Sequence, residues 1–206
     1  MYKKKFLAAA FLFLGFLVMV LLTSTRRLIN IDFAATNGLQ SLIPRSFDLP
    51  FSFFSLMGST EVVAVVMLAI AGLVYFKFKK IFWGLGMMAL IYVIEILGKY
   101  LIYHPGPPRE FFRYAIPFAF PHYVATNYSF PSGHVSRAFF LAVIVVFLAK
   151  KLNLSKQNFR IVAIVSGLMS LVMLLSRVYL GEHWLSDTIG GVFLGSTMGT
   201  LAILLF

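Results

Sequence analysis

The chain has 206 residues, of which 60% are hydrophobic and 12% are charged. Soluble domains carry about 45–50% apolar and about 25% charged residues, so this composition excludes a soluble globular protein and a disordered chain. The absence of cysteine excludes disulfides, thiol catalysis and cysteine-ligated metal sites. The formal net charge of +11 would suggest nucleic acid as the partner of a soluble protein. On a membrane protein it indicates topology signals, anionic lipids and an anionic substrate, and we expect no nucleic-acid partner.

Six stretches of the chain are apolar enough to cross a membrane, which takes roughly 20 residues each. They are residues 6–25, 53–76, 81–98, 132–149, 161–176 and 184–206, and each carries at most one charged residue. No internal repeat stands out, and no soluble domain fits between these stretches. We therefore predict an all-α, polytopic membrane protein with six transmembrane helices in one domain, residues 1–206.

The orientation of the chain is predicted from its ends and its cations. Three lysines precede the first apolar run, as in a signal peptide, but no small-x-small cleavage pattern follows, so we predict a retained anchor helix. With six spans and a cytoplasmic N-terminus, the cytoplasmic side holds ten Lys and Arg residues and the outer side holds eight. The ten form compact clusters beside short loops, whereas most of the eight are scattered singly. The outer cations therefore indicate a role other than membrane insertion.

Two outer segments are unusual. Residues 28–49 have apolar residues at helical spacing, which fits either an amphipathic helix in the membrane interface or an ordinary loop. Residues 100–131 hold six of the eight prolines, which forbid a continuous helix there. We predict a structured loop, and this loop also contains His104 and His122.

Three polar clusters lie at the outer ends of the spans, where polar side chains are costly and usually functional. The first contains Lys99, Arg109 and Arg113; the second is Pro131, Ser132, Gly133 and His134; the third is Ser176, Arg177, His183 and Asp187.

In the third cluster, His183 and Asp187 are four residues apart and share one face of a helix. The carboxylate can accept a hydrogen bond from one ring nitrogen, which leaves the other nitrogen as base or nucleophile. A structural hydrogen bond that caps a helix would have the same spacing, so both interpretations stay open for this cluster alone.

In the second cluster, Pro131 sets a turn, Ser132 is a favourable N-cap and Gly133 permits close approach of the backbone. The free N–H groups of a helix start bind anions, and His134 lies in the first turn. Simple punctuation between loop and helix is the alternative. In the first cluster, Lys99 follows Glu95 by four residues, so it either forms an ion pair within a helix or binds phosphate.

Taken together, the clusters contain two histidines, one carboxylate, several cations and an amide-rich helix start. This inventory favours phosphoryl transfer. The cations neutralise phosphate oxygens, one histidine attacks phosphorus or activates water, and the other protonates the departing oxygen.

On these residues the chain resembles the PAP2 family of membrane phosphatidic-acid-type lipid phosphatases. The family's second motif, P-S-G-H, stands at residues 131–134. Its third motif, S-R-x5-H-x3-D, stands at Ser176, Arg177, His183 and Asp187. The first motif, K-x6-R-P, is incomplete, because Lys99 and Pro107 are in place but Gly106 stands where the family has arginine. The six-helix layout extends the resemblance to nearly the whole chain.

The resemblance implies a role for each matching residue, with no metal and no cofactor. His183 would attack phosphorus and form a phosphohistidine, Asp187 would orient it, and His134 would be the general acid. The phosphate oxygens would be held by Lys99, Ser132, the Gly133 amide and Arg177.

The gap at Gly106 in the first motif calls for another cation. The turn-rich run after His104 leads us to expect that Arg109 supplies it; Arg113 in that role, or an Arg109 that only contacts lipid headgroups, are the alternatives.

The family also implies membrane lipids and a lipid phosphate as partners, and a site facing the extracytoplasmic side. Phosphatidylglycerophosphate is the favoured substrate, and undecaprenyl diphosphate or phosphatidic acid are alternatives.

Three other functions use the same residues. A serine hydrolase with Ser132, His183 and Asp187 would lack the G-x-S-x-G elbow. A metal-dependent hydrolase would draw on His104, His122, His134, His183 and Asp187. However, Lys99 and Arg177 would repel its dication. A non-enzymatic transporter or receptor for anionic lipid would use the cations but would not need the pair of His183 and Asp187.

Overall fold

The computed structural model of the protein describes residues 2–116 and 127–206, and its long elements are all helices. Six of them are long and apolar enough to cross a membrane. They are α1 (Tyr2–Ser24), α4 (Thr60–Phe78), α5 (Gly84–Leu101), α6 (Gly133–Lys151), α7 (Lys156–Tyr179) and α8 (Leu185–Leu204). The predicted all-α fold with six membrane-spanning helices is confirmed.

The second span begins later than predicted. The apolar run at residues 53–76 is divided into a short helix, α3 (Asp48–Leu56), and the spanning helix α4. At the break, the Ser59 hydroxyl accepts a hydrogen bond from the Val62 N–H and caps the start of α4. Hydropathy misses this break because both pieces are apolar. In contrast, α7 extends beyond the predicted 161–176 because its backbone ladder continues through Lys156, Arg160 and Arg177.

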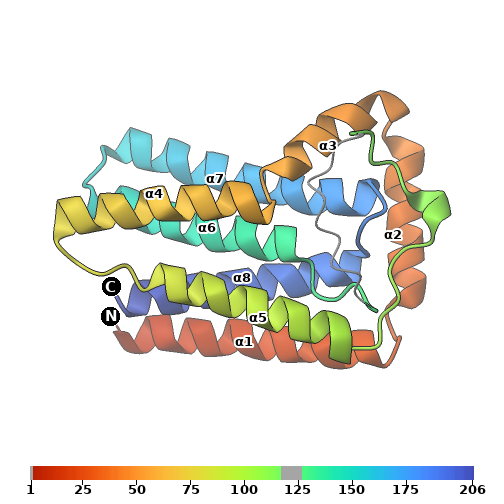
Figure 1. Cartoon of the computed structure of the whole chain (residues 1–206), viewed down its shortest axis with the longest axis horizontal. Coiled ribbons are helices and arrows are strands. Elements are labelled where there is room, and N and C mark those ends of the chain that lie inside the picture. Colours follow the sequence, from red (N-terminus) through yellow and green to blue (C-terminus); the bar gives the residue numbers. More distant parts are fainter. Residues whose placement is uncertain (1, 117–126) are drawn as a thin grey trace.

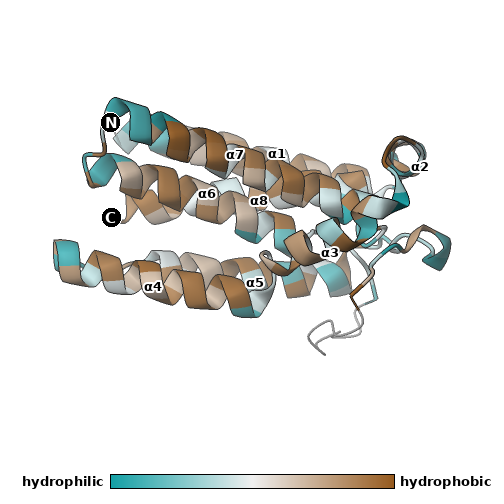
Figure 2. Ribbon diagram, turned by 90° about the horizontal axis from the view of Figure 1, so that it is seen from above, coloured by the Kyte–Doolittle hydropathy of each residue, from teal (hydrophilic) through white to brown (hydrophobic). Residues whose placement is uncertain are grey.

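Figure 1 shows the six spans running lengthwise, with both chain termini at the same end. At the opposite end α2 (Ile29–Leu42) runs across the bundle, and α3 also lies there. Hydrophobic residues cover much of the length of the spans, whereas hydrophilic residues gather toward their ends (Figure 2). Of the two interpretations of residues 28–49, the helix is confirmed, because α2 covers Ile29–Leu42 of this segment.

The proline-rich loop is non-helical apart from short turns in the part that the structure describes. It contains the 3₁₀ turn η2 (Arg109–Phe111), and another 3₁₀ turn, η1 (Arg45–Phe47), precedes α3. His122 lies outside the described residues.

The helices α6 and α8 pack backbone to backbone. A Cβ added at Gly191 of α8 would lie 2.7 Å from the Ser132 carbonyl oxygen, and one added at Gly195 would overlap the Ser136 carbonyl oxygen. Small residues spaced by four allow this close approach between membrane helices, where no hydrophobic force favours helix–helix over helix–lipid contact. The register of α6 on α8 therefore depends on these glycines.

The first prediction tests this packing. Gly195→Ala should destabilise the protein by about 1–3 kcal/mol, because its methyl group meets backbone that cannot move independently. Gly72→Ala in α4 is the matched control, since nothing lies within 4 Å of the added carbon. That change should leave stability unchanged or raise it by up to about 1 kcal/mol through helix propensity. Thermal unfolding in detergent measures both variants, and a Gly195→Ala protein as stable as the wild type would contradict the packing argument.

Candidate active site

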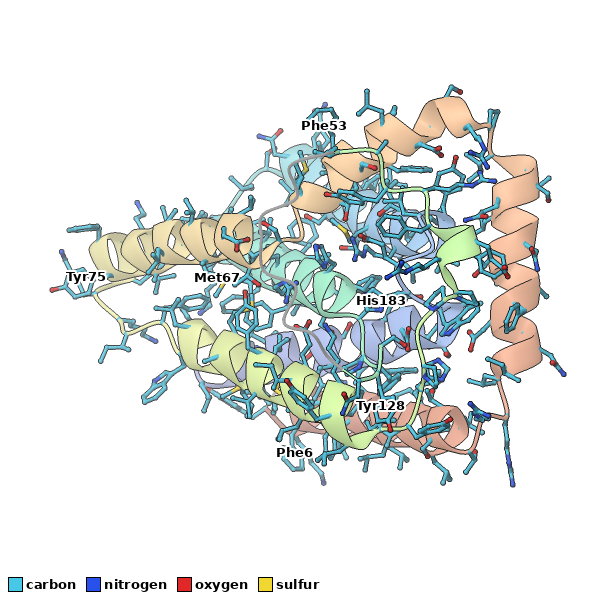
Figure 3. All side chains as sticks on the ribbon, turned by 45° about the vertical axis from the view of Figure 1, so that its right-hand side comes forward. Phe6, Phe53, Met67, Tyr75, Tyr128 and His183 are labelled. Atoms are coloured by element: carbon cyan, nitrogen blue, oxygen red, sulfur yellow. The ribbon has the colours of Figure 1, made fainter. Side chains whose placement is uncertain are left out.

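A cavity of about 550 Å³ lies at the end of the bundle that α2 crosses. Its charged and imidazole-bearing lining residues are Glu61, Glu95, Lys99, His134, Arg137, Arg177, Glu182 and His183. In Figure 3, His183 lies toward this end of the molecule, away from Tyr75 on α4. The structure thus brings residues of all three predicted clusters to one cavity.

His183 stands directly before α8 with Asp187 behind it. Its Nδ1 atom is 3.4 Å from Oδ2 of Asp187, and the same oxygen accepts a hydrogen bond of 3.0 Å from the Trp184 backbone N–H. Asp187 is fully buried and does not line the cavity, whereas His183 does. With Nδ1 turned toward Asp187, Nε2 is the ring nitrogen left for chemistry.

The protonation state of His183 suits a nucleophile. Burial lowers the pKa of His183 well below its ordinary value, and the nearby guanidinium of Arg177 and ammonium of Lys99 lower it further. The imidazole is therefore neutral at neutral pH, and one ring nitrogen carries a free lone pair.

The start of α6 is tied to α8 through backbone. The Ser132 N–H donates a 3.0 Å hydrogen bond to the Asp187 carbonyl oxygen. Ser132 occupies the N-cap position, but its side chain makes no capping hydrogen bond and does not line the cavity. Ser132 is therefore the N-cap residue by position, as predicted, but its buried hydroxyl (0% exposed) does not cap the helix.

Gly133 has a more specific reason to be glycine. A Cβ at this position would overlap the carboxylate of Glu95, which reaches across from α5 to the first turn of α6. A negative charge is favourable at a helix N-terminus. The helix start thus holds an internal carboxylate next to the cavity.

Each cation at the cavity has a carboxylate partner. Lys99 Nζ is 2.7 Å from Oε1 of Glu95, so the predicted ion pair within the helix is confirmed. Arg137 Nη1 is 2.8 Å from Oε2 of the same carboxylate. Arg177 pairs with Glu182 and also donates to the Ser55 hydroxyl.

Arg137 is further held on two sides. Its Nε donates a 2.8 Å hydrogen bond to the Gly58 carbonyl oxygen, and its Nη2 lies 3.4 Å from Nδ1 of His134. Because arginine only donates hydrogen bonds, Nδ1 of His134 is the acceptor and its ring proton sits on Nε2.

Arg137 is one of the eight outer cations and was not predicted to lie in the site. Two signals were available: it is charged within an apolar span, and it follows His134 by three residues on the same helix face. Glu182 was also missed, although it directly precedes His183.

The structure does not bring Arg109 or Arg113 to the cavity. Arg109 is exposed in η2 and does not line the cavity, whereas Gly106 and Pro107 do. Arg113 donates to the Gln40 carbonyl oxygen at 3.2 Å and lies over the ring of Tyr179. It joins the loop to α2 and α7.

Among residues 2–116 and 127–206, no group of three or more His, Asp or Glu side chains is placed to hold a metal ion. His104, one of the candidate ligands, lies behind Asp187 at 3.4 Å from its Oδ1 rather than beside His134.

Fold and site together define a polytopic helical membrane protein with two histidines and three cations around one cavity. The chain belongs to the PAP2 superfamily, whose pattern matches residues 80–206.

One sequence relative and one solved structure, both from Bacillus subtilis, are similar to the chain. The chain is 32% identical over 130 residues to phosphatidylglycerophosphatase B of strain 168, and the match covers 63% of this chain and 61% of that relative. The fold resembles the crystal structure of a transmembrane PAP2 type phosphatidylglycerolphosphate phosphatase, with a TM-score of 0.77 and 24% identity. That similarity covers 98% of this chain and 95% of the other. The expected family is confirmed.

Proposed function

We propose that the protein is a membrane lipid phosphatase that works through a phosphohistidine on His183. The observation that carries this proposal is the neutral His183, backed by Asp187, in the same cavity as His134 and three cations. Nε2 of His183 attacks phosphorus while the bond between phosphorus and the lipid oxygen breaks. His134 takes up a proton when the anionic phosphate binds, and as an imidazolium it gives its Nε2 proton to the departing oxygen. Water then attacks the phosphohistidine, His134 takes a proton from that water, and inorganic phosphate leaves.

Lys99, Arg137 and Arg177 stabilise the negative charge on the phosphate oxygens in this scheme. Preorganised cations act strongly in a site shielded from water, because their orientation is set before the reaction begins. The ion pairs with Glu95 and Glu182 supply that orientation.

The favoured substrate is phosphatidylglycerophosphate, because a relative with that activity in its name is 32% identical. The cavity lies at one end of the spans, so a headgroup can enter it while the acyl chains stay in the bilayer. Undecaprenyl diphosphate and phosphatidic acid are the other lipids to compare.

The second prediction tests this function. Purified protein should release phosphate from at least one of these three lipids with chelator present, and vanadate should inhibit it. His183→Ala should abolish turnover, and quenching the wild type in alkaline detergent should trap a phosphoenzyme that is stable in alkali and labile in acid. If chelation abolishes turnover and a divalent metal restores it, or if no lipid is hydrolysed, the proposal is wrong.

The third prediction separates Arg137 from Arg109 as the cation that compensates for Gly106. Arg137→Ala should lower turnover by about 10²-fold or more, the usual loss for one preorganised donor. Arg137→Lys keeps the positive charge but loses the planar guanidinium with its several donors, so its turnover should lie between that of the wild type and that of Arg137→Ala. Arg109→Ala should lose less than about tenfold, as expected of an exposed residue that only contacts lipid headgroups. A larger loss from Arg109→Ala than from Arg137→Ala would assign the role to Arg109 instead.

The fourth prediction concerns orientation. We propose cytoplasmic termini and an extracytoplasmic site, on the basis of the clustered lysines near the termini. The chain has no cysteine of its own, so any labelling of a single introduced cysteine shows the side of the membrane on which that residue lies. Leu154→Cys, between α6 and α7, should react with an impermeant reagent only after the membrane is opened. Glu110→Cys in η2 should react in intact cells, and the reverse pattern would invert the topology.

A further inference from the structure

We propose that His104 is a positioning residue that holds Asp187 from the side opposite His183, with Asp32 and Ser186 keeping His104 in place. This inference rests on the proposed function, because it concerns how the His183–Asp187 pair is oriented. None of these three supporting residues lines the cavity, so none of them is assigned to substrate.

The geometry places the Asp187 carboxylate between two imidazoles. Nε2 of His104 is 3.4 Å from Oδ1 of Asp187, while Nδ1 of His183 is 3.4 Å from Oδ2. His104 is 2% exposed and Asp187 is fully buried, so water does not compete at this carboxylate. In the unliganded geometry such contacts are often long, and they tighten when substrate binds.

The hydrogen atoms around His104 can be assigned from its neighbours. The Ser186 hydroxyl donates to Oδ2 of Asp32 at 2.8 Å, and the Ser186 backbone N–H donates to Oδ1 of Asp32 at 2.8 Å. The single hydroxyl hydrogen is thereby used, so the Ser186 oxygen faces His104 Nε2, 3.2 Å away, as an acceptor. Oδ2 of Asp32 lies 3.8 Å from the same nitrogen.

With acceptors on every side, Nε2 of His104 carries a hydrogen. Burial, with a smaller effect of the nearby Arg26, lowers the pKa of His104 to about 4. The ring is therefore neutral at neutral pH, and its one N–H faces the Ser186 oxygen at 3.2 Å and Oδ1 of Asp187 at 3.4 Å. A neutral donor of this kind steadies a carboxylate without cancelling the charge that the carboxylate presents to His183.

The backbone around His104 is also fixed. The Ser129 N–H and hydroxyl each donate to the His104 carbonyl oxygen at 3.0 Å. The indole N–H of Trp184 donates to the Pro105 carbonyl oxygen at 2.8 Å. These hydrogen bonds fix the backbone at His104 and Pro105 and so restrict where the His104 ring can lie.

Burial of the Asp32 carboxylate is unfavourable by itself, so its hydrogen bonds must offset the loss of hydration. Asp32 is a fully buried carboxylate on α2, and burial raises its pKa. Burying a carboxylate is unfavourable unless its hydrogen bonds are satisfied. Both of its oxygens accept from Ser186, the residue that precedes Asp187, so α2 is tied directly to the first turn of α8.

The experiment compares kcat and KM of purified variants on phosphatidylglycerophosphate, phosphatidic acid and undecaprenyl diphosphate, using whichever the wild type hydrolyses. His104→Leu removes the donor and should lower kcat by about tenfold or more with KM within about threefold, because orientation and not binding is lost. His104→Gln restores an N–H near the same place and should recover most of kcat. Asp48→Asn is the matched control, since Asp48 is a carboxylate on α3 that accepts from the Tyr179 hydroxyl at 2.5 Å. It should stay within about twofold of the wild type.

The pH profile distinguishes positioning from a general structural role. Without the donor from His104, the Asp187 carboxylate becomes more basic and raises the pKa of His183. The acid limb of kcat/KM should then move to higher pH in His104→Leu, and a structural defect would lower the whole profile without moving this limb. If His104→Leu does not fold, His104→Phe, which also lacks an N–H donor, is measured in its place and should give the same loss in kcat and the same shift.

The two failures are distinct. If the wild type hydrolyses none of the lipids, the proposed function is wrong. If the wild type is active and His104→Leu keeps kcat within about twofold, the positioning role of His104 is wrong. The role is also wrong if His104→Leu loses activity, the acid limb of its pH profile does not move and His104→Gln does not restore kcat.

Discussion

The contact between the first turns of α6 and α8 is the constraint on which the site depends. The Ser132 N–H meets the Asp187 carbonyl oxygen at 3.0 Å, and the glycines of α8 let the two backbones come that close. His134 and His183 each lie beside this contact, one at the start of α6 and the other just before α8. Their separation is therefore set by this contact between packed helices, and His183, in the turn before α8, is also held by the hydrogen bond from its N–H to the Arg177 carbonyl oxygen. Sites built on packed helices hold their geometry more precisely than sites built on loops.

The second requirement of the site is that its cations are paired with carboxylates. Cations close to a bilayer are costly to bury, so each needs a counter-charge. Glu95 serves Lys99 and Arg137, and Glu182 serves Arg177. In the proposed reaction, a phosphate in the cavity would compete with these internal carboxylates for the cations.

Much of the fold could be predicted from sequence because span formation is local. A run of apolar residues decides that a helix crosses the membrane, and the six runs did so here. The break between α3 and α4 was missed because it depends on one hydrogen bond, from the Val62 N–H to the Ser59 hydroxyl, inside an apolar stretch. The two complete motifs were readable because their residues are near neighbours in the chain. Arg137 and Glu95 are on different helices, and only the packing of α5 against α6 shows that they form one ion pair.

The face that α2 turns to the protein was also beyond the sequence pattern. An amphipathic helix at an interface normally buries its apolar face in lipid and shows its polar face to water. Here Asp32 and Thr36 are buried against the protein, whereas Ile31 and Leu42 are exposed. The polar face of α2 is thus used inside the molecule, where Asp32 accepts two hydrogen bonds from Ser186. Because α2 is hydrogen-bonded beside Asp187, an exposed apolar face placed in the membrane surface would tie the position of the bilayer to the position of the His183–Asp187 pair.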